Sequence, residues 1–268
     1  MLISSRHLSH WINNFYGYGD WSAPVWFVGF EESGGDLPEE VAEKLNYFYR
    51  EHPADNSPTL CDIRKLYREV VFRTDGPRAE RYKNFFDYRF GEHAVLHGLW
   101  KNLIVFEHGL RDKPIPDLAS YQRRNFLSTE KPMEALIELY PLPAHNHAWY
   151  YSWLDLPDLP FLKTRSQYEQ HVFQDRMTTI LNNISQRQPE VVLMFGMKDI
   201  NGIKEMIQQK FPSTRFTLVR TIKHQIPQHH RADLGATTLL LTTQIPALKH
   251  NRKETGFDWE AVAKSIKG

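Results

Sequence analysis

Apolar and polar positions along the chain follow two alternating patterns. Short apolar runs bounded by Gly or polar residues predict buried strands at residues 25–29, 135–139, 191–197 and 237–243, and an alternating run at 214–223 predicts an edge strand. Segments with apolar residues at helical spacing separate these runs, at residues 2–16, 37–49, 93–110, 166–184, 199–210 and 257–268. Because strands alternate with helices and neither a repeat nor a low-complexity linker interrupts them, we predict one α/β domain over residues 1–268 with a parallel central sheet.

Carboxylates directly follow the first predicted strand. The stretch 25–36 reads VWFVGFEESGGD, so Glu31 and Glu32 stand at the end of the strand, before a Gly-Gly turn. Three further strand-end loops follow Leu139, Phe195 and Thr243. Ligands of α/β proteins bind outside the carboxyl ends of the strands, so we expect the four loops to border one cleft. Solvated acids on a tight turn are the simpler interpretation of the first loop taken alone.

Composition is that of an ordinary globular protein. The 268 residues are 41% hydrophobic and 24% charged with a net charge of +1, which does not suggest a polyanion binder but is compatible with a local basic groove. Cys61 is the only cysteine, so we expect no intrachain disulfide and no cysteine-based zinc site, and interpret it as a structural thiol in a reducing compartment. The N-terminus lacks a signal-peptide core and no apolar run approaches about 20 residues. We therefore expect a soluble, cytoplasmic protein without membrane contact, and a monomer.

Several common active-site motifs are absent. Neither GxGxxG nor GxxxxGK[ST] occurs, so Rossmann dinucleotide and P-loop sites are unsupported, and the serine elbow GxSxG is missing. Two close pairs of histidines occur, His145 with His147 and His229 with His230. Neither pair has the i, i+4 spacing of helical metal ligands, and we expect no cofactor, although a metal-dependent hydrolase using Asp36, Glu31 and histidines stays open as an alternative. The remaining chemistry is that of carboxylates, which orient water or stabilise a cationic sugar during glycosidic cleavage.

Residues 76–92 form a basic and aromatic segment. Four cations interleave with five aromatic rings between Arg78 and Phe90. Cations next to aromatic rings suit single strands or splayed nucleotides. A helix with a basic outer face explains the same pattern equally well.

The order of these motifs resembles the uracil-DNA glycosylase superfamily. The segment Gly29–Gly34 is similar to the family's first motif, with Glu31 at the position of the acid that orients the attacking water, or Glu32 if the register shifts by one. Residues 138–143 (ELYPLP) are similar to the base-reading segment of divergent members, and residues 191–196 to the penultimate strand. Residues 242–247 (TTQIPA) occupy the place of the final His-Pro-Ser motif. The resemblance implies a three-layer α/β/α sandwich with a central, mostly parallel four-stranded sheet.

The chain departs from the family pattern at three positions. Phe30 replaces a polar residue, and Thr243 or Gln244 stands where the family has its motif histidine, so that His250 or a histidine from 224–230 would have to replace it. The four cysteines of the iron–sulfur branches are absent. Glu138 replaces the base-reading Asn; an ionised carboxylate only accepts hydrogen bonds and pairs with the exocyclic amine of cytosine. A buried structural acid that anchors the Pro-Leu-Pro loop is the alternative role of Glu138.

The resemblance implies a DNA glycosylase that flips a base and hydrolytically excises it. The departures favour a modified base, such as a cytosine derivative, over plain uracil, and suggest a role against modified phage DNA. The catalytic candidates are Glu31 and Glu32, and the base-binding candidates are Phe27, Phe30, Glu138, Tyr140 and Gln244. The DNA-binding candidates are Pro141, Pro143, Pro246, Lys249, His250, Arg252 and Lys253. A non-catalytic nucleic-acid-binding module on the same scaffold is the second hypothesis.

Overall fold

The computed structural model describes residues 3–32, 37–53, 57–144, 149–154, 156–223, 225–247 and 256–267. The α-helices are α1 (Ser5–Asn14), α2 (Pro38–Glu51), α3 (Ile63–Glu69), α4 (Pro77–Arg81), α5 (Phe85–Phe90), α6 (Gly98–Leu110), α7 (Leu118–Arg124), α8 (Arg165–Arg187), α9 (Ile200–Lys210) and α10 (Trp259–Lys264). Two 3-10 helices are η1 (Tyr150–Trp153) and η2 (Pro160–Lys163). The strands are β1 (Phe15–Tyr18), β2 (Val25–Glu31), β3 (Thr59–Cys61), β4 (Glu134–Tyr140), β5 (Val191–Phe195), β6 (Thr217–Val219), β7 (His229–Leu234) and β8 (Thr237–Leu241).

One mixed sheet runs through the described part of the molecule, in the order β3-β1-β4-β2-β5-β8-β7-β6. The strands β4, β2, β5 and β8 are mutually parallel and correspond to the four buried strands predicted from the apolar runs. The prediction of a four-stranded sheet is wrong, because β1 and β3 extend one edge and β7 and β6 the other, giving eight strands. The α/β class is confirmed.

The extra strands have sequences that do not alternate clearly. β1 follows α1 without a turn, and its aromatic residues continue the apolar spacing of that helix. Gly17 of β1 has a φ of +131°, and a Cβ there would clash with the carbonyl oxygen of Leu136 in β4. β7 carries the polar sequence HHRADL and pairs antiparallel to β8, in a segment that the sequence had indicated as a loop.

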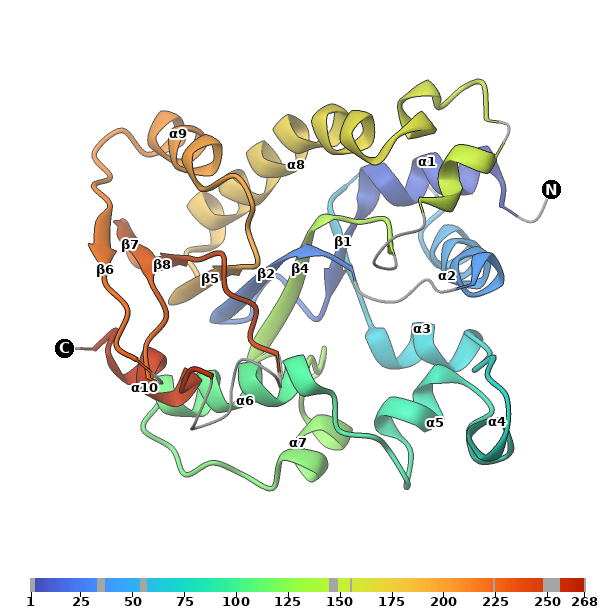
Figure 1. The fold of residues 1–268 in the computed structure, drawn as a ribbon, viewed down its shortest axis with the longest axis horizontal. Helices are drawn as coiled ribbons and strands as arrows, with labels where there is room; N and C mark the ends of the chain where they lie inside the picture. Colours follow the sequence, from blue (N-terminus) through green and yellow to red (C-terminus); the bar gives the residue numbers. More distant parts are fainter. Residues whose placement is uncertain are drawn as a thin grey trace.

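Helices cover both faces of the sheet (Figure 1). α8, α9 and α1 lie over one face, and α6, α7 and α10 lie over the other. Phe27 of β2 meets Phe106 of α6 edge to face at 5.7 Å, which places α6 directly on the parallel strands. Val25, Trp26, Phe27 and Val28 are all fully buried, as expected of a strand with helices on both sides. No helix within the described ranges is long and apolar enough to cross a membrane.

Candidate active site

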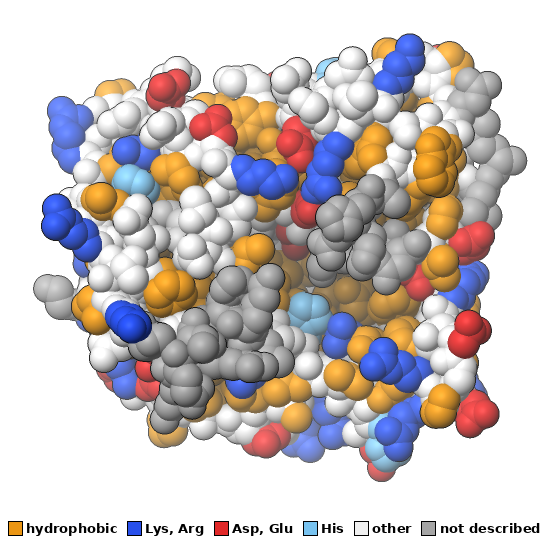
Figure 2. Space-filling model, viewed as in Figure 1, with side chains coloured by type: hydrophobic (Ala, Val, Ile, Leu, Met, Phe, Trp, Pro, Cys, Tyr) orange, Lys and Arg blue, Asp and Glu red, His pale blue; other side chains and the backbone are white. Residues whose placement is uncertain are grey.

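The candidate site lies at the carboxyl ends of β2 and β4. Figure 2 shows a hollow in this face of the molecule, between the end of β2 and the helices α3 and α6, with acidic side chains at its border. The parallel register pairs Gly29 with Glu138 and Glu31 with Tyr140. The strand pairing therefore brings together two segments that lie more than a hundred residues apart in the sequence.

Glu138 is a buried acid that faces a glycine. Its side chain is 4% exposed, and its Oε2 atom has no hydrogen-bond partner among the described residues. A Cβ at Gly29 would lie 2.8 Å from this oxygen and 3.2 Å from the ring of Phe195 in β5. Burial raises the pKa of Glu138 well above its ordinary value, and the nearby carboxylates of Glu32 and Glu31 raise it further. Burial therefore favours the protonated form of Glu138, which has one donor and additional acceptor capacity.

Glu32 belongs to a second buried group. The Lys44 ammonium of α2 donates to its Oε1 at 2.6 Å, and the Tyr18 hydroxyl of β1 donates to the same oxygen. Although burial alone lowers the pKa of Lys44, the charge of Glu32 raises it to a net value above that of an ordinary lysine. The other oxygen, Oε2, is buried without a described partner.

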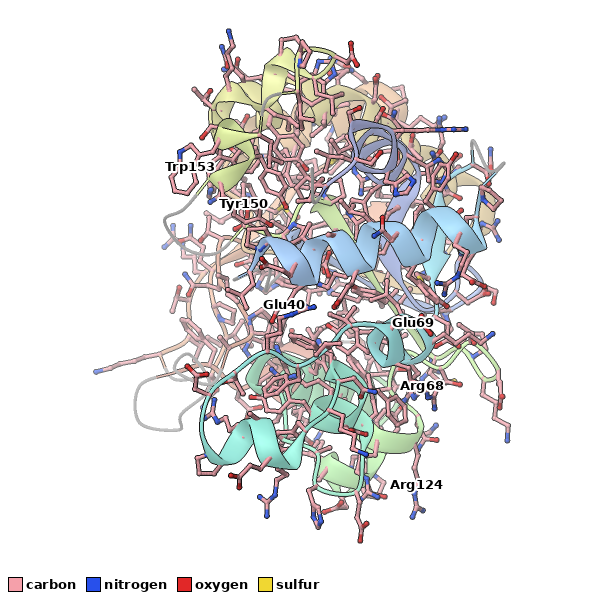
Figure 3. The ribbon with its side chains drawn as sticks, turned by 90° about the vertical axis from the view of Figure 1, so that its right-hand side faces the viewer. Glu40, Arg68, Glu69, Arg124, Tyr150 and Trp153 are labelled. Atoms are coloured by element: carbon pink, nitrogen blue, oxygen red, sulfur yellow. The ribbon has the colours of Figure 1, made fainter. Side chains whose placement is uncertain are left out.

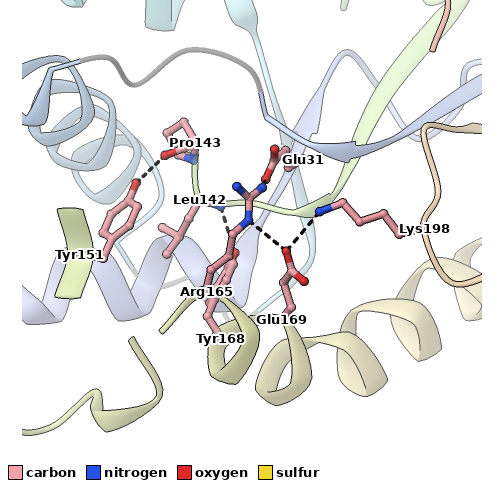
Figure 4. Close-up of polar contacts among 8 residues, drawn as sticks. All are labelled: Glu31, Leu142, Pro143, Tyr151, Arg165, Tyr168, Glu169 and Lys198. Atoms are coloured by element: carbon pink, nitrogen blue, oxygen red, sulfur yellow. Dashed lines mark hydrogen bonds and ion pairs between the residues drawn. The ribbon is translucent and has the colours of Figure 1, made fainter. Parts of the chain in front are cut away.

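Glu31 points to the opposite side, towards α8 (Figure 4). The Arg165 guanidinium at the start of α8 forms an ion pair with Glu31 and donates from Nε to Glu169 at 3.0 Å. The Lys198 ammonium lies 3.7 Å from the same Glu169 carboxylate. Burial raises the pKa of Glu31, and the hydrogen bond and charge of Arg165 oppose that rise. The two adjacent acids of the strand-end motif thus have separate environments.

Aromatic rings lie beside Glu31. Phe30 and Tyr140 are in tilted contact, with ring centroids 4.8 Å apart, and Lys198 Nζ lies 4.0 Å from the centre of the Phe30 ring. Phe30 is partly exposed, whereas Tyr140 is 7% exposed. Of these two predicted base-binding rings, Phe30 is therefore the more accessible.

The loop after β8 approaches the same end of the sheet. Gly196 N donates to Gln244 O at 3.0 Å, and a Cβ at Gly196 would lie 3.2 Å from Ile245 and 3.8 Å from Phe30. Gln244 is partly exposed. In the described residues the loops after β2, β4, β5 and β8 thus follow the carboxyl ends of parallel strands, at one end of the sheet.

Several predicted contact residues are buried. Phe27 is fully buried against α6, so the prediction that it stacks on a base is wrong. Pro141, Pro143 and Pro246 are also buried. Their carbonyl groups accept hydrogen bonds from Trp11 (2.9 Å), Tyr151 (2.9 Å) and Asn102 (2.9 Å), respectively. These prolines shape the loops, and their side chains are not accessible to DNA.

Other predicted residues lie outside the described ranges. These are Lys249, His250, Arg252 and Lys253 of the predicted DNA-binding set, and Asp36, His145, His147 and His224 among the acids and histidines considered for a metal site or for the missing imidazole. His229 is described and buried, with its ring nitrogen 2.9 Å from Pro227 O. It lies on β7, three strands away from β2, or roughly 14 Å at the usual strand spacing. β7 is the strand paired with β8, whose loop carries the motif position.

Three residues of the site were missed in the sequence. Lys44 occupies the apolar stripe of α2 with Val41, Leu45 and Phe48, and a lysine on such a stripe is a readable signal of a buried ion pair. Arg165 gives no comparable signal, because only the fold brings it to Glu31. Arg176 of α8 is buried and donates to the carbonyls of Leu139 (2.9 Å) and Phe15 (2.7 Å), which holds the end of β4 against β1.

Rings of the basic and aromatic segment pack against one another and against the main core, to which Phe90 belongs. Phe72 stacks on Tyr88 at 4.5 Å and meets Tyr82 edge to face, while Tyr82 is 5% exposed. These rings are used in packing and do not form a free stacking surface. Arg89 of this segment donates to Val95 O at 3.3 Å and pairs with no carboxylate of the described residues.

Metal binding has no support in the described ranges, where no group of three or more His, Cys, Asp or Glu side chains is placed to hold an ion. The alternative that uses Asp36 lies partly outside these ranges. Comparison with models of known protein families gave no match, and neither did comparison with curated protein sequences.

Proposed function

We propose that the chain is a DNA glycosylase that hydrolyses the N-glycosidic bond of a flipped pyrimidine nucleotide. The observation that carries this proposal is the pair of buried acids with different environments at the ends of adjacent parallel strands. Glu138 is buried against Gly29 with a raised pKa, and Glu32 is paired with Lys44 and Tyr18. Titratable groups whose surroundings separate their protonation states are typical of acid–base sites.

The Glu138 carboxyl group, which packs against Gly29, is the proposed contact for the edge of the base. A neutral carboxyl group donates one hydrogen bond and accepts another. It therefore matches the adjacent N3 acceptor and N4 amine of cytosine. An ionised Glu138 could only accept hydrogen bonds and would therefore contact the N4 amine alone. A rotation of the carboxyl group exchanges its donor and acceptor oxygens, so that it also matches N3–H and O4 of uracil. Both bases are therefore included in the assay.

The proposed reaction needs a water molecule and an ionised carboxylate. Glu31 or Glu32 orients the water against C1′ and stabilises the positive charge that develops on the sugar. The water oxygen forms a bond to C1′, and one water proton passes to the carboxylate. The C1′–N bond breaks, and its electron pair leaves with the base, which receives a hydrogen bond from Glu138. Glu31 at the strand end is partly exposed, whereas Glu32 is 2% exposed, so Glu31 is the better-placed acid for this role.

The ion pair between Arg165 and Glu31 supports the second hypothesis, a DNA-binding module without catalysis. Arg165 is bound to the Glu31 carboxylate and therefore competes with a water molecule for the carboxylate oxygens. Base release separates the two functions. Oligonucleotides containing uracil, hypoxanthine, cytosine or hydroxymethylcytosine derivatives are incubated with the protein, and abasic sites are detected by strand cleavage in alkali. Salt-dependent binding without abasic sites would favour the module.

A further inference from the structure

Trp153 is the most exposed of the large hydrophobic side chains in the described residues. Its side chain is 81% exposed, whereas the next, Ile222, is 49% exposed. Three other tryptophans, Trp11, Trp26 and Trp259, are at most 1% exposed. An indole left in water forgoes a large burial energy, and such rings are enriched where a protein binds a partner.

Hydrogen bonds fix the turn η1, which carries Trp153. Trp153 ends η1, and Ser152 Oγ donates to Trp149 O at 2.8 Å within this turn. The hydroxyl of Tyr151 donates to Pro143 O at 2.9 Å, which ties η1 to the loop that follows β4. Trp149 Nε1 donates to Leu162 O at 2.7 Å, which ties the start of η1 to η2. The exposed indole is therefore held on a fixed turn.

The same turn borders the candidate active site. Tyr150, at the other end of η1, is buried and lies close enough to Lys44 and Glu32 for both charges to act on its hydroxyl. Side chains three residues apart lie on the same side of a 3-10 helix, about 6 Å apart along its axis. Figure 3 shows Tyr150 and Trp153 next to each other on the same side of the molecule, with Glu40 of α2 below them. Trp153 therefore stands on the outer rim of the site and Tyr150 on its inner wall.

A cavity lies next to the indole. Its volume is about 390 Å³, and Trp153, Leu154, Pro157 and Lys163 are among the residues that line it. This volume is within the range of small-molecule sites, and Lys163 supplies a positive charge at its edge. An apolar wall, a free π-face and a cation together suit a nucleotide more than an apolar protein segment.

We propose that Trp153 stacks on the base next to the flipped nucleotide of single-stranded DNA, with Lys163 near the adjoining phosphate. This inference rests on the proposed function, because it takes the carboxylate site as the place of the flipped base. In single-stranded DNA the neighbouring base offers a free face to the indole without any unpairing, whereas in a duplex that face is exposed only after a paired nucleotide has left the helix. The turn therefore selects single-stranded DNA over duplex DNA.

The test compares Trp153→Ala, Trp153→Phe and the control Leu218→Ala, which removes another exposed apolar side chain, on β6. Binding of a fluorescein-labelled single-stranded oligonucleotide is measured by anisotropy. Base stacking of about 1–3 kcal/mol predicts that Trp153→Ala weakens binding by roughly 5- to 150-fold. Trp153→Phe should keep most of the affinity, and Leu218→Ala all of it. A 2-aminopurine next to the target base should be quenched by the wild type and not by Trp153→Ala.

Equal affinity of Trp153→Ala and wild type for single-stranded DNA would overturn the inference. So would concentration-dependent self-association of the wild type that Trp153→Ala abolishes without change in DNA binding, because the indole would then cover a second copy. Circular dichroism of each variant checks that the fold is intact. The readout is binding, so an absence of base release would contradict the proposed function, whereas only unchanged binding by Trp153→Ala would contradict the stacking of Trp153 on DNA.

Discussion

Gly29 and Glu138 occupy paired positions in adjacent parallel strands, and the missing Cβ of the glycine leaves room for the Glu138 carboxyl group. Glycine is needed here because of close approach, since its φ angle is not in the left-handed region. The pair explains how a sheet interior accommodates an acid.

Gly29→Ala should close this space. The added Cβ would lie 2.8 Å from Glu138 Oε2, so we expect a loss of about 1–3 kcal/mol in the free energy of unfolding by urea, with loss of base release. The double variant Gly29→Ala/Glu138→Ala removes the crowded carboxyl group and should recover stability but not activity. If Gly29→Ala had wild-type stability and activity, the close approach of Gly29 and the Glu138 carboxyl group would be contradicted.

Lys44→Met should destabilise the protein strongly. It leaves Glu32 buried without its cation, which predicts a loss of roughly 3–5 kcal/mol in urea unfolding. The double variant Lys44→Met/Glu32→Gln removes both charges and should recover much of this loss. The control Lys264→Met breaks an exposed pair with Glu260 and should change stability little. Similar effects of the two lysine variants would show that the Glu32 pair is not buried.

The free energy of unfolding should fall as pH rises, because Glu134 ionises. Burial raises the pKa of Glu134 to about 8, and the Tyr121 hydroxyl donates to it at 2.6 Å. Because the folded pKa is above the ordinary value of 4.5, the folded state holds the proton more tightly, and its contribution is complete below pH 4.5 and is lost as pH rises through about 8. Thermal unfolding between about pH 5 and about pH 9 should therefore show a smaller decline for Glu134→Gln than for the wild type. Parallel declines would contradict this.

Arg165→Met should shift the pH profile of base release. Arg165 opposes the rise in the pKa of Glu31, so its removal raises that pKa further. If ionised Glu31 orients the water, the acidic limb of kcat/KM moves to higher pH. Lys198→Met removes a weaker charge effect and should move the limb less. An unmoved limb in Arg165→Met would assign the water to Glu32 instead.

Glu138→Gln and Glu138→Leu should separate recognition from structure. Glutamine keeps one donor side and one acceptor side, so it should retain base release, whereas leucine should lose about 1–3 kcal/mol of discrimination or binding to the base. Thermal stability of both variants should be at least that of the wild type, since the buried acid is removed. Full activity of Glu138→Leu would leave Glu138 with only the structural role of anchoring its loop.

The sequence predicts the parallel centre of the fold because β2, β4, β5 and β8 are uninterrupted or nearly uninterrupted apolar runs. It does not predict β1 or β7, whose residues take their strand conformation from pairing with β4 and β8. Whether a short polar or Gly-containing segment forms a strand depends more on pairing with neighbouring strands than on the local preference of its residues.

The candidate site is predictable to a similar extent. Glu31, Glu32 and Glu138 are found at strand ends from the pattern alone, but their partners are not. Arg165 lies 134 residues from Glu31, and the divergence of two adjacent acids into separate ion pairs depends on where α2 and α8 pack. The burial of Phe27 was in principle readable, since it stands in the middle of a strand covered on both sides.

The most direct test of the central claim is base release by the wild type and by Glu31→Gln and Glu32→Gln. Single-stranded and duplex DNA containing uracil, hypoxanthine, cytosine or hydroxymethylcytosine derivatives are incubated with each protein, and abasic sites are measured by alkaline cleavage. We predict release of a pyrimidine from single-stranded DNA, with a loss of about 100-fold or more in the variant that removes the water-orienting acid. Absence of abasic sites from every substrate with the folded wild-type protein would contradict the proposed function.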